Sequence, residues 1–214
     1  MDLFSQEEDI SALSYDEVVK TALTCTKCPL AKGRTKVVFG NGPVPCDLML
    51  IGEAPGADED EQGLPFVGRS GQLLTQILAS VGIKRPDDIY IANTVKCRPP
   101  DNRAPLPKEQ EACAPYLAAQ IKHVRPKIIL LAGAPAVKAI LKTDEPMTQI
   151  RGTWLKLPGT EIAVMPLFHP AYLLRNPSKE KGKPKWLTWQ DVQEVKNALD
   201  YLHKVAELAK GSEN

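Results

Sequence analysis

Apolar and polar positions along this chain form two recurring patterns, short continuous apolar runs and longer amphipathic segments. Four runs of five to eight residues have the length and composition of buried strands. They are DLMLI (47–51), DIYIAN (88–93), KIILLAG (127–133) and EIAVMPLF (161–168). Segments between them place apolar residues on one side of a helix, namely SGQLLTQILASVG (70–82), KEQEACAPYLAAQIKHV (108–124) and APAVKAILK (134–142). Strands alternating with helices in this way predict an α/β fold whose mostly parallel sheet is covered on both faces.

The two ends of the chain extend this pattern. Residues 1–13 have no apolar period and predict a flexible tail. A first helix is expected over YDEVVKTAL (15–23), with Ser14 as its N-terminal cap. An amphipathic helix over residues 187–209 closes the chain. A length of 214 residues fits one domain spanning 1–214.

Composition and charge narrow the class of protein. The chain is 43% hydrophobic and 25% charged, which is typical of a globular protein. It has no apolar run of 18 residues, and its acidic start, MDLFSQEEDI, is unlike a secretory signal, so we expect a cytoplasmic protein and no membrane span. The net charge of +1 neither requires nor excludes nucleic acid, but RNPSKEKGKPK (175–185) carries five basic residues against one acid. Such a run is usually a solvated loop, and beside a functional site it would contact phosphate.

Functional residue types follow the predicted strands. In parallel sheets, ligands bind beyond the carboxyl ends of the strands. Here the first strand is followed by GEAPG, the second ends in Asn93, the third leads into AGAPA, and the fourth leads into His169. We therefore expect a turn, an amide and an imidazole to converge at one edge of the sheet.

The turn after the first strand, GEAPGADEDEQGLPFVG (52–68), combines glycines with clustered acids. It lacks the lysine of a phosphate-binding loop and the glycine spacing of a dinucleotide site, and its carboxylates would repel an anion. A structural turn with solvated acids is one interpretation. The other is a pocket for a neutral polar ring, in which main-chain N–H groups meet carbonyl oxygens and Phe66 provides a stacking face.

Asn93 and His169 fit the second interpretation. A side-chain amide offers a donor and an acceptor, which match the O4 and N3–H edge of uracil. A histidine at a strand end could donate a hydrogen bond to an oxygen that gains negative charge. Taken singly, Asn93 could instead be a strand-end cap and His169 a satisfied loop residue.

Four of the five cysteines suggest a metal site. Cys25 and Cys28 form a C-x2-C pair, and 15 residues separate Cys97 from Cys113. In a cytoplasmic chain such thiols indicate metal ligands rather than disulfides. Zinc and an iron–sulfur cluster both suit four thiolates, and spacing alone does not choose between them. From the residues by themselves, zinc is slightly preferred. Cys46 has no nearby partner in sequence and is expected to be a buried small hydrophobe.

Four segments together carry a family resemblance. They are CTKC, GEAPGADEDEQGLPFVGRSGQLL, ANTVKCRPPDNRAPLP and HPAYLLRNP. In this order, from about Tyr15 to Asn176, the chain resembles the family 4 uracil-DNA glycosylases. The resemblance implies a three-layer α/β/α sandwich with a central four-stranded parallel sheet. It also implies a [4Fe–4S] cluster held by Cys25, Cys28, Cys97 and Cys113 in a structural role, which replaces the preference for zinc.

The resemblance further implies the reaction and the binding roles. Uracil would be removed from DNA after the nucleotide leaves the base stack. The protein is expected to act as a monomer. Phe66 would stack on the base, Asn93 would read its edge, and the main chain of Glu53 and Ala54 would line the pocket. His169 would stabilise charge on uracil O2 as the glycosidic bond breaks.

The carboxylate that serves the reaction is less sharply defined by the resemblance. Related families carry an aspartate where this chain has Ala54, so the usual water-activating residue is absent. Glu53 is the first candidate, because it lies in the turn itself, and Glu59 is the second. The remaining acids of the segment are expected to be solvated surface.

The loop after His169 resembles a segment that enters the DNA minor groove. Candidate DNA contacts there are Leu173, Leu174, Arg175, Lys179 and Lys181.

Three alternative functions remain. A relative that traps uracil-DNA covalently would carry a histidine near residues 98–108, and RPPDNRAPLPK has none. A non-catalytic iron–sulfur DNA-binding protein would not need the set Glu53, Phe66, Asn93 and His169. A lyase would need an amine nucleophile, for which Lys96 is the nearest candidate.

Overall fold

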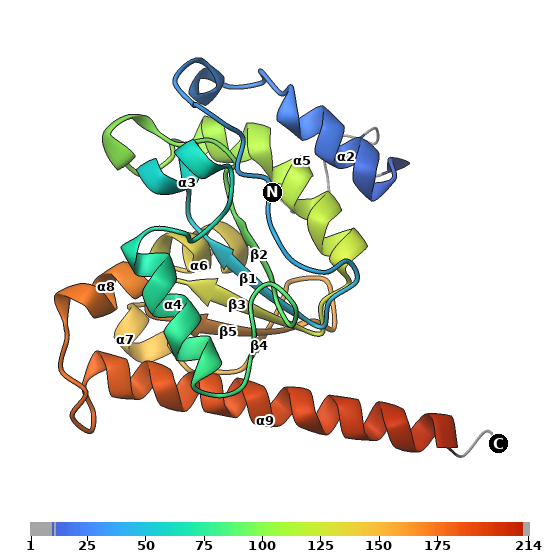
Figure 1. Cartoon of the computed structure of the whole chain (residues 1–214), viewed down its shortest axis with the longest axis vertical. Helices are drawn as coiled ribbons and strands as arrows, with labels where there is room; N and C mark the ends of the chain where they lie inside the picture. Colours follow the sequence, from blue (N-terminus) through green and yellow to red (C-terminus); the bar gives the residue numbers. More distant parts are fainter. Residues whose placement is uncertain (1–9, 11, 212–214) are drawn as a thin grey trace.

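The computed structural model describes residue 10 and residues 12–211 (Figure 1). Its strands are β1 (Leu48–Gly52), β2 (Tyr90–Asn93), β3 (Ile128–Ala132), β4 (Leu155–Lys156) and β5 (Ala163–Leu167). The longer helices are α2 (Tyr15–Leu23), α4 (Arg69–Ala79), α5 (Pro107–Val124), α6 (Ala134–Leu141) and α9 (Pro184–Gly211). The short ones are α3 (Ala57–Gln62), α7 (Met147–Ile150) and α8 (Pro170–Arg175), with 3-10 turns at Pro29–Lys32 and Pro100–Asn102.

The sheet has the order β2-β1-β3-β5-β4. All four predicted strands are present and pair in parallel, so the carboxyl ends of β1, β2, β3 and β5 lie at one edge. The fifth strand, β4, is two residues long and pairs antiparallel with β5. The sequence did not predict it, because a two-residue strand carries no periodic signal.

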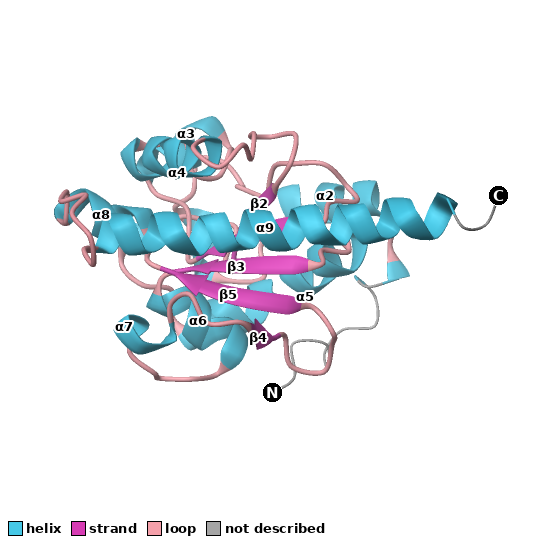
Figure 2. Ribbon diagram, turned by 90° about the horizontal axis from the view of Figure 1, so that it is seen from below, coloured by secondary structure: helices cyan, strands magenta, loops and turns pink. Residues whose placement is uncertain are grey.

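Helices cover both faces of the sheet, as the alternation of patterns predicted (Figure 2). Alternate residues of each strand point to opposite faces. Met49 and Ile51 of β1 belong to a core with α5, α6 and α7, whereas Leu48 and Leu50 belong to a core with α4 and α9. The result is the predicted three-layer α/β/α arrangement.

A third apolar cluster joins the segment before β1 to α2 and α5. It contains Val18 and Ala22 of α2, Phe39, and Tyr116 of α5. The predicted cap of α2 is confirmed, since Ser14 and Glu17 form a reciprocal capping box. This cluster fixes α2 and the first cysteine pair beside the strand end of β2.

Most of the predicted flexible tail, residues 1–13, lies outside the described residues. Within the described part, Ile10 is buried and the His123 ring contacts the main-chain oxygen of Leu13 at 2.9 Å. This end of the predicted tail is therefore packed against the protein, which corrects the prediction.

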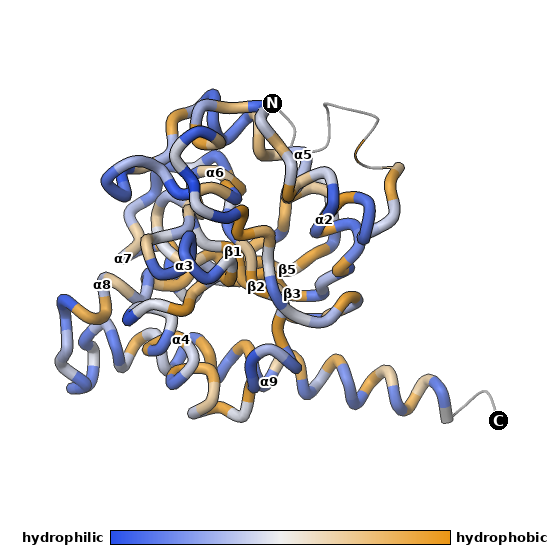
Figure 3. The backbone as a smooth tube through the Cα atoms, turned by 45° about the horizontal axis from the view of Figure 1, so that its top comes forward, coloured by the Kyte–Doolittle hydropathy of each residue, from blue (hydrophilic) through white to orange (hydrophobic). Residues whose placement is uncertain are grey.

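The C-terminal helix α9 begins near α8 and runs past the opposite edge of the sheet (Figures 1 and 2). Its residues 201–210 are all exposed, and polar and hydrophobic positions alternate along them (Figure 3). In the part of the chain that the structure describes, no helix combines the length and the apolar character needed to cross a membrane.

Candidate functional site

A cavity of about 870 Å³ lies at the carboxyl edge of the sheet. Four strand ends contribute to its lining, through Glu53 after β1, Asn93 of β2, Gly133 after β3 and His169 after β5. Phe66 joins them from the loop between α3 and α4. The structure therefore brings together the turn, the amide, the imidazole and the stacking ring that the sequence placed at separate positions. We call this space the strand-end cavity.

Gly52, the last residue of β1, lets two of these side chains approach each other. A Cβ atom at this position would lie 2.4 Å from Asn93 Oδ1 and 2.7 Å from Phe66 Cζ. These are closer than any real Cβ contact, so only glycine permits the arrangement. The amide and the aromatic ring consequently meet over the strand end.

The main chain at Phe66 is held in a left-handed conformation, with φ 52°. Arg85 donates to the oxygens of Pro65 and Phe66 at 2.9 and 2.8 Å. On the other side, Glu59 Oε1 accepts from the N–H groups of Val67 and Gly68 at 2.8 and 2.9 Å. Two charged side chains thus clamp an unfavourable backbone conformation and fix the direction of the ring.

Asn93 presents an unsatisfied acceptor to this space. The residue is 2% exposed, and its Oδ1 has no hydrogen-bond partner among the described residues. A buried polar atom without a partner costs folding free energy, and such atoms are rare in native proteins. The orphaned oxygen therefore indicates a ligand that brings a hydrogen-bond donor.

His169 is held as a neutral donor. Its Nδ1 accepts a hydrogen bond from the Ala171 N–H at 3.1 Å, which leaves the proton of the neutral ring on Nε2. Burial, together with the positive charge of Arg175, lowers the pKa of His169 to about 4. The ring lies 5.8 Å from that of Phe66, measured between centroids. An uncharged N–H donor thus stands beside the aromatic face.

The acids of the turn divide into three groups. Glu53 is half-buried, its carboxylate has no hydrogen-bond partner among the described residues, and burial raises its pKa. Glu59 and Asp60 are buried and bind main-chain N–H groups, whereas Asp58 and Glu61 are exposed. The expectation of solvated acids therefore holds for Asp58 and Glu61 but is wrong for Asp60.

The segment after His169 is a short helix, α8, and not the loop that was expected. Leu173 is fully buried at 0% exposure, so it cannot enter a groove of DNA, which corrects its assignment. Leu174 is half-buried, Arg175 is exposed and lines the strand-end cavity, and Lys179 and Lys181 are exposed.

The four cysteines that were predicted to bind metal line a second, small cavity beyond the end of β2. Cys25, Cys28, Cys97 and Cys113 surround it together with Lys27, Arg34 and Lys96. We call it the cysteine cavity. Arg34 Nη1 donates to Cys97 Sγ, and the Lys96 N–H donates to Cys113 Sγ, both at 3.3 Å.

The charges of this lining suit a metal–thiolate group. The described lining contains three cationic side chains and no carboxylate. Burial raises the pKa of the Cys97 thiol, and raises that of Cys113 to about 11. Four thiols among cations fit an anionic group that holds them as thiolates.

No three Cys, His, Asp or Glu side chains of the described residues form a group that could hold a metal ion. The four thiols nevertheless share one cavity with a cationic lining, so their chemistry as a set fits a metal–thiolate group.

Lys96 is unsuited to a nucleophilic role. It is 2% exposed and lines the cysteine cavity, not the strand-end cavity. Burial lowers the pKa of Lys96 to about 8, although the neighbouring thiols oppose that shift.

Several residues that line or shape the strand-end cavity were not found from the sequence. Arg85 lies after α4, far from any recognised motif, and only its contacts reveal it. Asn102 and Arg103 line the strand-end cavity from the loop after β2, where Asp101 and Asn102 both have left-handed φ angles. The Pro-Pro-Asp-Asn sequence before Arg103 is typical of such a turn, so turn chemistry could have indicated this loop.

Comparison with known proteins identifies the class. The sequence model of the uracil DNA glycosylase superfamily matches residues 39–193, which include both cavities except for the first cysteine pair and the adjacent residues. The chain belongs to this superfamily.

Comparison with individual relatives identifies the family within this superfamily. The type-4 uracil-DNA glycosylase of Thermotoga maritima is 42% identical over 198 residues, covering 92% of this chain and 98% of the relative. That of Archaeoglobus fulgidus is 39% identical over 77% of this chain and 85% of its own length. A type-5 uracil-DNA glycosylase of Pyrobaculum aerophilum is 30% identical over 60% of this chain. Within the superfamily, the chain belongs to the type-4 uracil-DNA glycosylases, as the resemblance indicated.

Proposed function

We infer that the chain is a DNA repair glycosylase that hydrolyses the N-glycosidic bond of deoxyuridine in DNA. The products would be free uracil and an abasic site. The observation that carries this inference is the orphaned Asn93 Oδ1, buried beside an aromatic ring and a neutral imidazole N–H. Uracil matches these groups with an N3–H donor, a flat face and a carbonyl oxygen at O2.

Each side chain has a proposed role. Phe66 stacks on the extruded base, Asn93 accepts from N3–H and donates to O4, and the main chain at Glu53 and Ala54 lines the pocket. His169 donates from Nε2 to O2 as that oxygen gains negative charge. A neutral donor suits this step, because its hydrogen bond strengthens as O2 gains negative charge and no charged ring has to be buried beside the neutral base.

The sugar gains positive charge as uracil leaves, so a nearby carboxylate is useful. We propose Glu53 for this role and for orienting the attacking water, since its carboxylate is desolvated and lines the cavity. Glu59 is the second candidate, but both of its oxygens accept main-chain N–H groups, which supports a role in holding Phe66.

Paired variants separate the two carboxylates. In single-turnover assays, Glu53→Ala should slow uracil release by about a hundredfold or more. Glu59→Ala should mainly weaken binding of the base. Wild-type rates in both variants would exclude a carboxylate role.

A [4Fe–4S] cluster bound by Cys25, Cys28, Cys97 and Cys113 completes the proposal. It would supply a structural link between the end of α2 and the segment after β2. Iron and acid-labile sulfide analysis, with absorbance at about 400 nm, distinguishes it from zinc.

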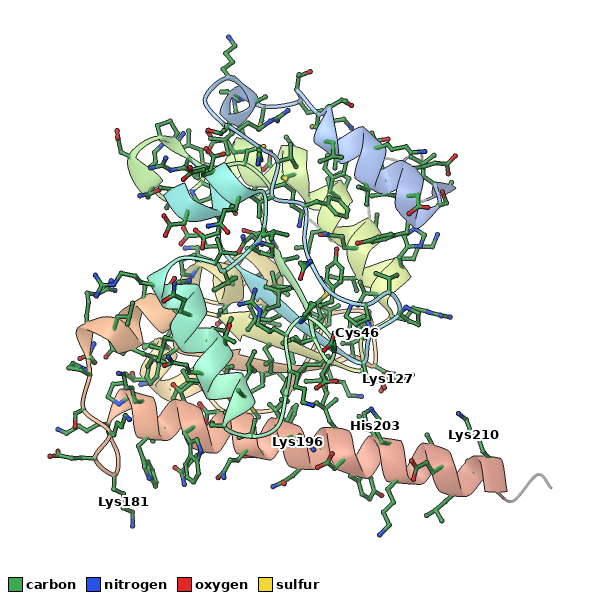
Figure 4. The ribbon with its side chains drawn as sticks, in the orientation of Figure 1. Cys46, Lys127, Lys181, Lys196, His203 and Lys210 are labelled. Carbon is green, nitrogen blue, oxygen red and sulfur yellow. The ribbon has the colours of Figure 1, made fainter. Side chains whose placement is uncertain are left out.

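Binding to DNA is proposed through Leu174, Arg175, Lys179 and Lys181. Figure 4 shows Lys181 at the loop between α8 and α9, pointing away from the protein. We further propose that the chain acts as a single-domain monomer in the cytoplasm.

The central test uses an oligonucleotide with one deoxyuridine. Incubation followed by alkaline cleavage should cut the strand at that position, while the same strand with thymidine should remain intact. An uncut uracil strand, with iron-loaded protein, would exclude the proposed reaction. A protein–DNA adduct that survives denaturation would favour the covalently trapping alternative.

A further inference from the structure

Only three residues separate the amide of the strand-end cavity from the nearest ligand, in sequence, of the cysteine cavity. Asn93 ends β2, and Cys97 follows it as one of the four thiols. Between them, the Thr94 N–H donates to the oxygen of Gly52 at 2.9 Å, and the Val95 N–H donates to the oxygen of Glu53 at 3.2 Å. The segment therefore braces the turn at Glu53 as well as carrying Asn93.

Lys96 is the side chain of this segment that connects the cysteine cavity, which it lines, to the main chain of Asn93. Its Nζ donates to the main-chain oxygen of Asn93 at 2.6 Å and to Gln120 Oε1. Gln120 is itself fixed, since its Nε2 donates to the oxygen of Phe39 and to Tyr90 Oη at 2.8 and 2.9 Å. The main-chain N–H of Lys96 meanwhile donates to Cys113 Sγ.

The charge of Lys96 has no carboxylate partner among the described residues. Its two Nζ acceptors are a carbonyl and an amide oxygen, both neutral, and the side chain is 2% exposed. An ammonium buried without a counter-charge is strongly unfavourable. The candidate anions are the cysteine sulfurs, which line the same cavity as Lys96 and carry negative charge when they bind metal.

We propose that the buried ammonium of Lys96 is a counter-charge of the metal–thiolate group and, through its hydrogen bond to the Asn93 carbonyl, sets the position of the uracil-reading amide. This inference rests on the proposed cluster and extends it, because the cluster would then support base recognition as well as the attachment of α2. Lys96 is a positioning residue in this scheme and does not touch the base.

Two substitutions separate the charge from the hydrogen bond. Lys96→Met removes both, whereas Lys96→Gln removes the charge but retains an N–H donor toward Asn93. Both variants should shift the reduction potential of the cluster to more negative values, because a nearby positive charge stabilises the reduced state. Binding of radiolabelled uracil in equilibrium dialysis should weaken about tenfold in Lys96→Met and less in Lys96→Gln.

Lys27→Met is the matched control. Lys27 lines the same cavity but is exposed. It lies within the first cysteine pair, before β1, and not in the segment that carries Asn93. Its removal should leave uracil affinity unchanged and shift the potential less, since solvent screens an exposed charge. Equal shifts in Lys27→Met and Lys96→Met would overturn the special role of Lys96.

The outcomes separate this inference from the proposed function. Wild-type protein without iron would overturn the cluster and the inference together. Iron-loaded Lys96→Met with wild-type potential and wild-type uracil affinity would overturn the inference alone, and a shifted potential with unchanged affinity would overturn the link to Asn93. If neither variant retains iron, uracil binding is measured instead on wild-type protein stripped of iron. This protein must first be shown by circular dichroism to keep its fold. The inference predicts about tenfold weaker uracil binding, and unchanged affinity would overturn it.

Discussion

The strand-end cavity and the cysteine cavity are separated by one short segment of chain, yet only the first has carboxylates among its described lining residues. Glu53 and Glu59 line it with two cations, Arg103 and Arg175, and with a histidine that burial keeps neutral. The second has three cationic side chains and no carboxylate among its described lining residues. A lining in which acids and cations balance suits a neutral base, and its carboxylates suit a sugar that becomes positive, whereas a cationic lining suits metal-bound thiolates. The fold supplies the position of each site, and the charge of its lining indicates which ligand it accepts.

The two cavities also differ in how they are built. Residues following four parallel strands form the first, and glycines allow its groups to approach. The second joins a pair of cysteines before β1 to cysteines after β2 and within α5. The first is thus a property of the sheet edge, and the second fastens distant segments together. Substitutions should therefore affect them independently, except where Lys96 connects them.

The largest expected effect is on the reaction, from His169→Leu. Loss of the Nε2 donor should reduce the single-turnover rate by about a hundred- to a thousandfold, as for other groups that stabilise a developing oxyanion. Iron content should not change, because His169 does not line the cysteine cavity. His169→Gln, which retains an N–H donor, should recover part of the rate. A rate in His169→Leu within a few fold of wild type would remove His169 from the mechanism.

Next in size is the dependence of the rate on pH. Since the pKa of His169 is lowered to about 4, the rate should not follow a histidine titration between about pH 6 and 8. It should fall as the pH drops toward 4, where the ring becomes charged and Nδ1 can no longer accept from Ala171. Stability should fall in the same direction between about pH 6.5 and 4, because the unfolded state binds a proton that the folded state does not. A midpoint near pH 6.5 in the rate would contradict a neutral, buried imidazole.

A smaller loss of activity is expected when the close approach of Asn93 and Phe66 is disturbed. Gly52→Ala should lower kcat/KM by about tenfold or more, because the added Cβ would displace Asn93 Oδ1 and the Phe66 ring. Gly33→Ala is the matched control, since no atom lies within 4 Å of its added Cβ. Equal activity in the two variants would show that the contact over Gly52 does not matter for the reaction.

The assignment of the cysteine cavity as a metal site can be tested by comparing one of its cysteines with Cys46, which lies outside it. Cys113→Ala should remove bound iron and lower the melting temperature. Cys46→Ala should retain iron, because Cys46 is buried on its own and its thiol donates to the oxygen of Leu48 at 3.2 Å. Iron content and thermal unfolding measure the difference, and iron loss in Cys46→Ala would contradict the assignment of the four ligands.

The smallest effects concern DNA binding outside the cavities. Lys179→Ala and Lys181→Ala should each weaken binding of uracil-containing and ordinary DNA alike. Each should reduce the slope of log affinity against log salt by about one. Lys210→Ala on the far end of α9 is the control and should leave the slope unchanged (Figure 4). An unchanged slope in all three would exclude the basic loop from the DNA interface.

Much of the fold could be predicted from the sequence, because each strand of the parallel sheet is buried on both faces and gives a continuous apolar run. The strand-end residues could also be located, since the carboxyl ends of parallel strands meet at one edge. The elements that were missed are short. The sequence of α8 was interpreted as a loop, and the burial of Leu173 depends on packing that a leucine-leucine pair does not reveal.

The clamp on Phe66 could not be predicted for a different reason. Arg85 and Glu59 are distant from each other in sequence and act on the main chain, so no residue pattern links them. The link through Lys96 is hidden in the same way. A lysine between a strand and a cysteine is expected at the surface, and only its burial in three dimensions makes its charge informative.

The outer half of α9 offers a practical means of handling the protein. The 28-residue helix is about 42 Å long and carries its last turns away from α8 and the strand-end cavity (Figure 1). A fluorophore, an affinity label or a covalent linkage to a glass surface beyond Lys210 would stand far from the opening where DNA is proposed to dock. Single molecules could thus be tethered there and watched while they scan a strand.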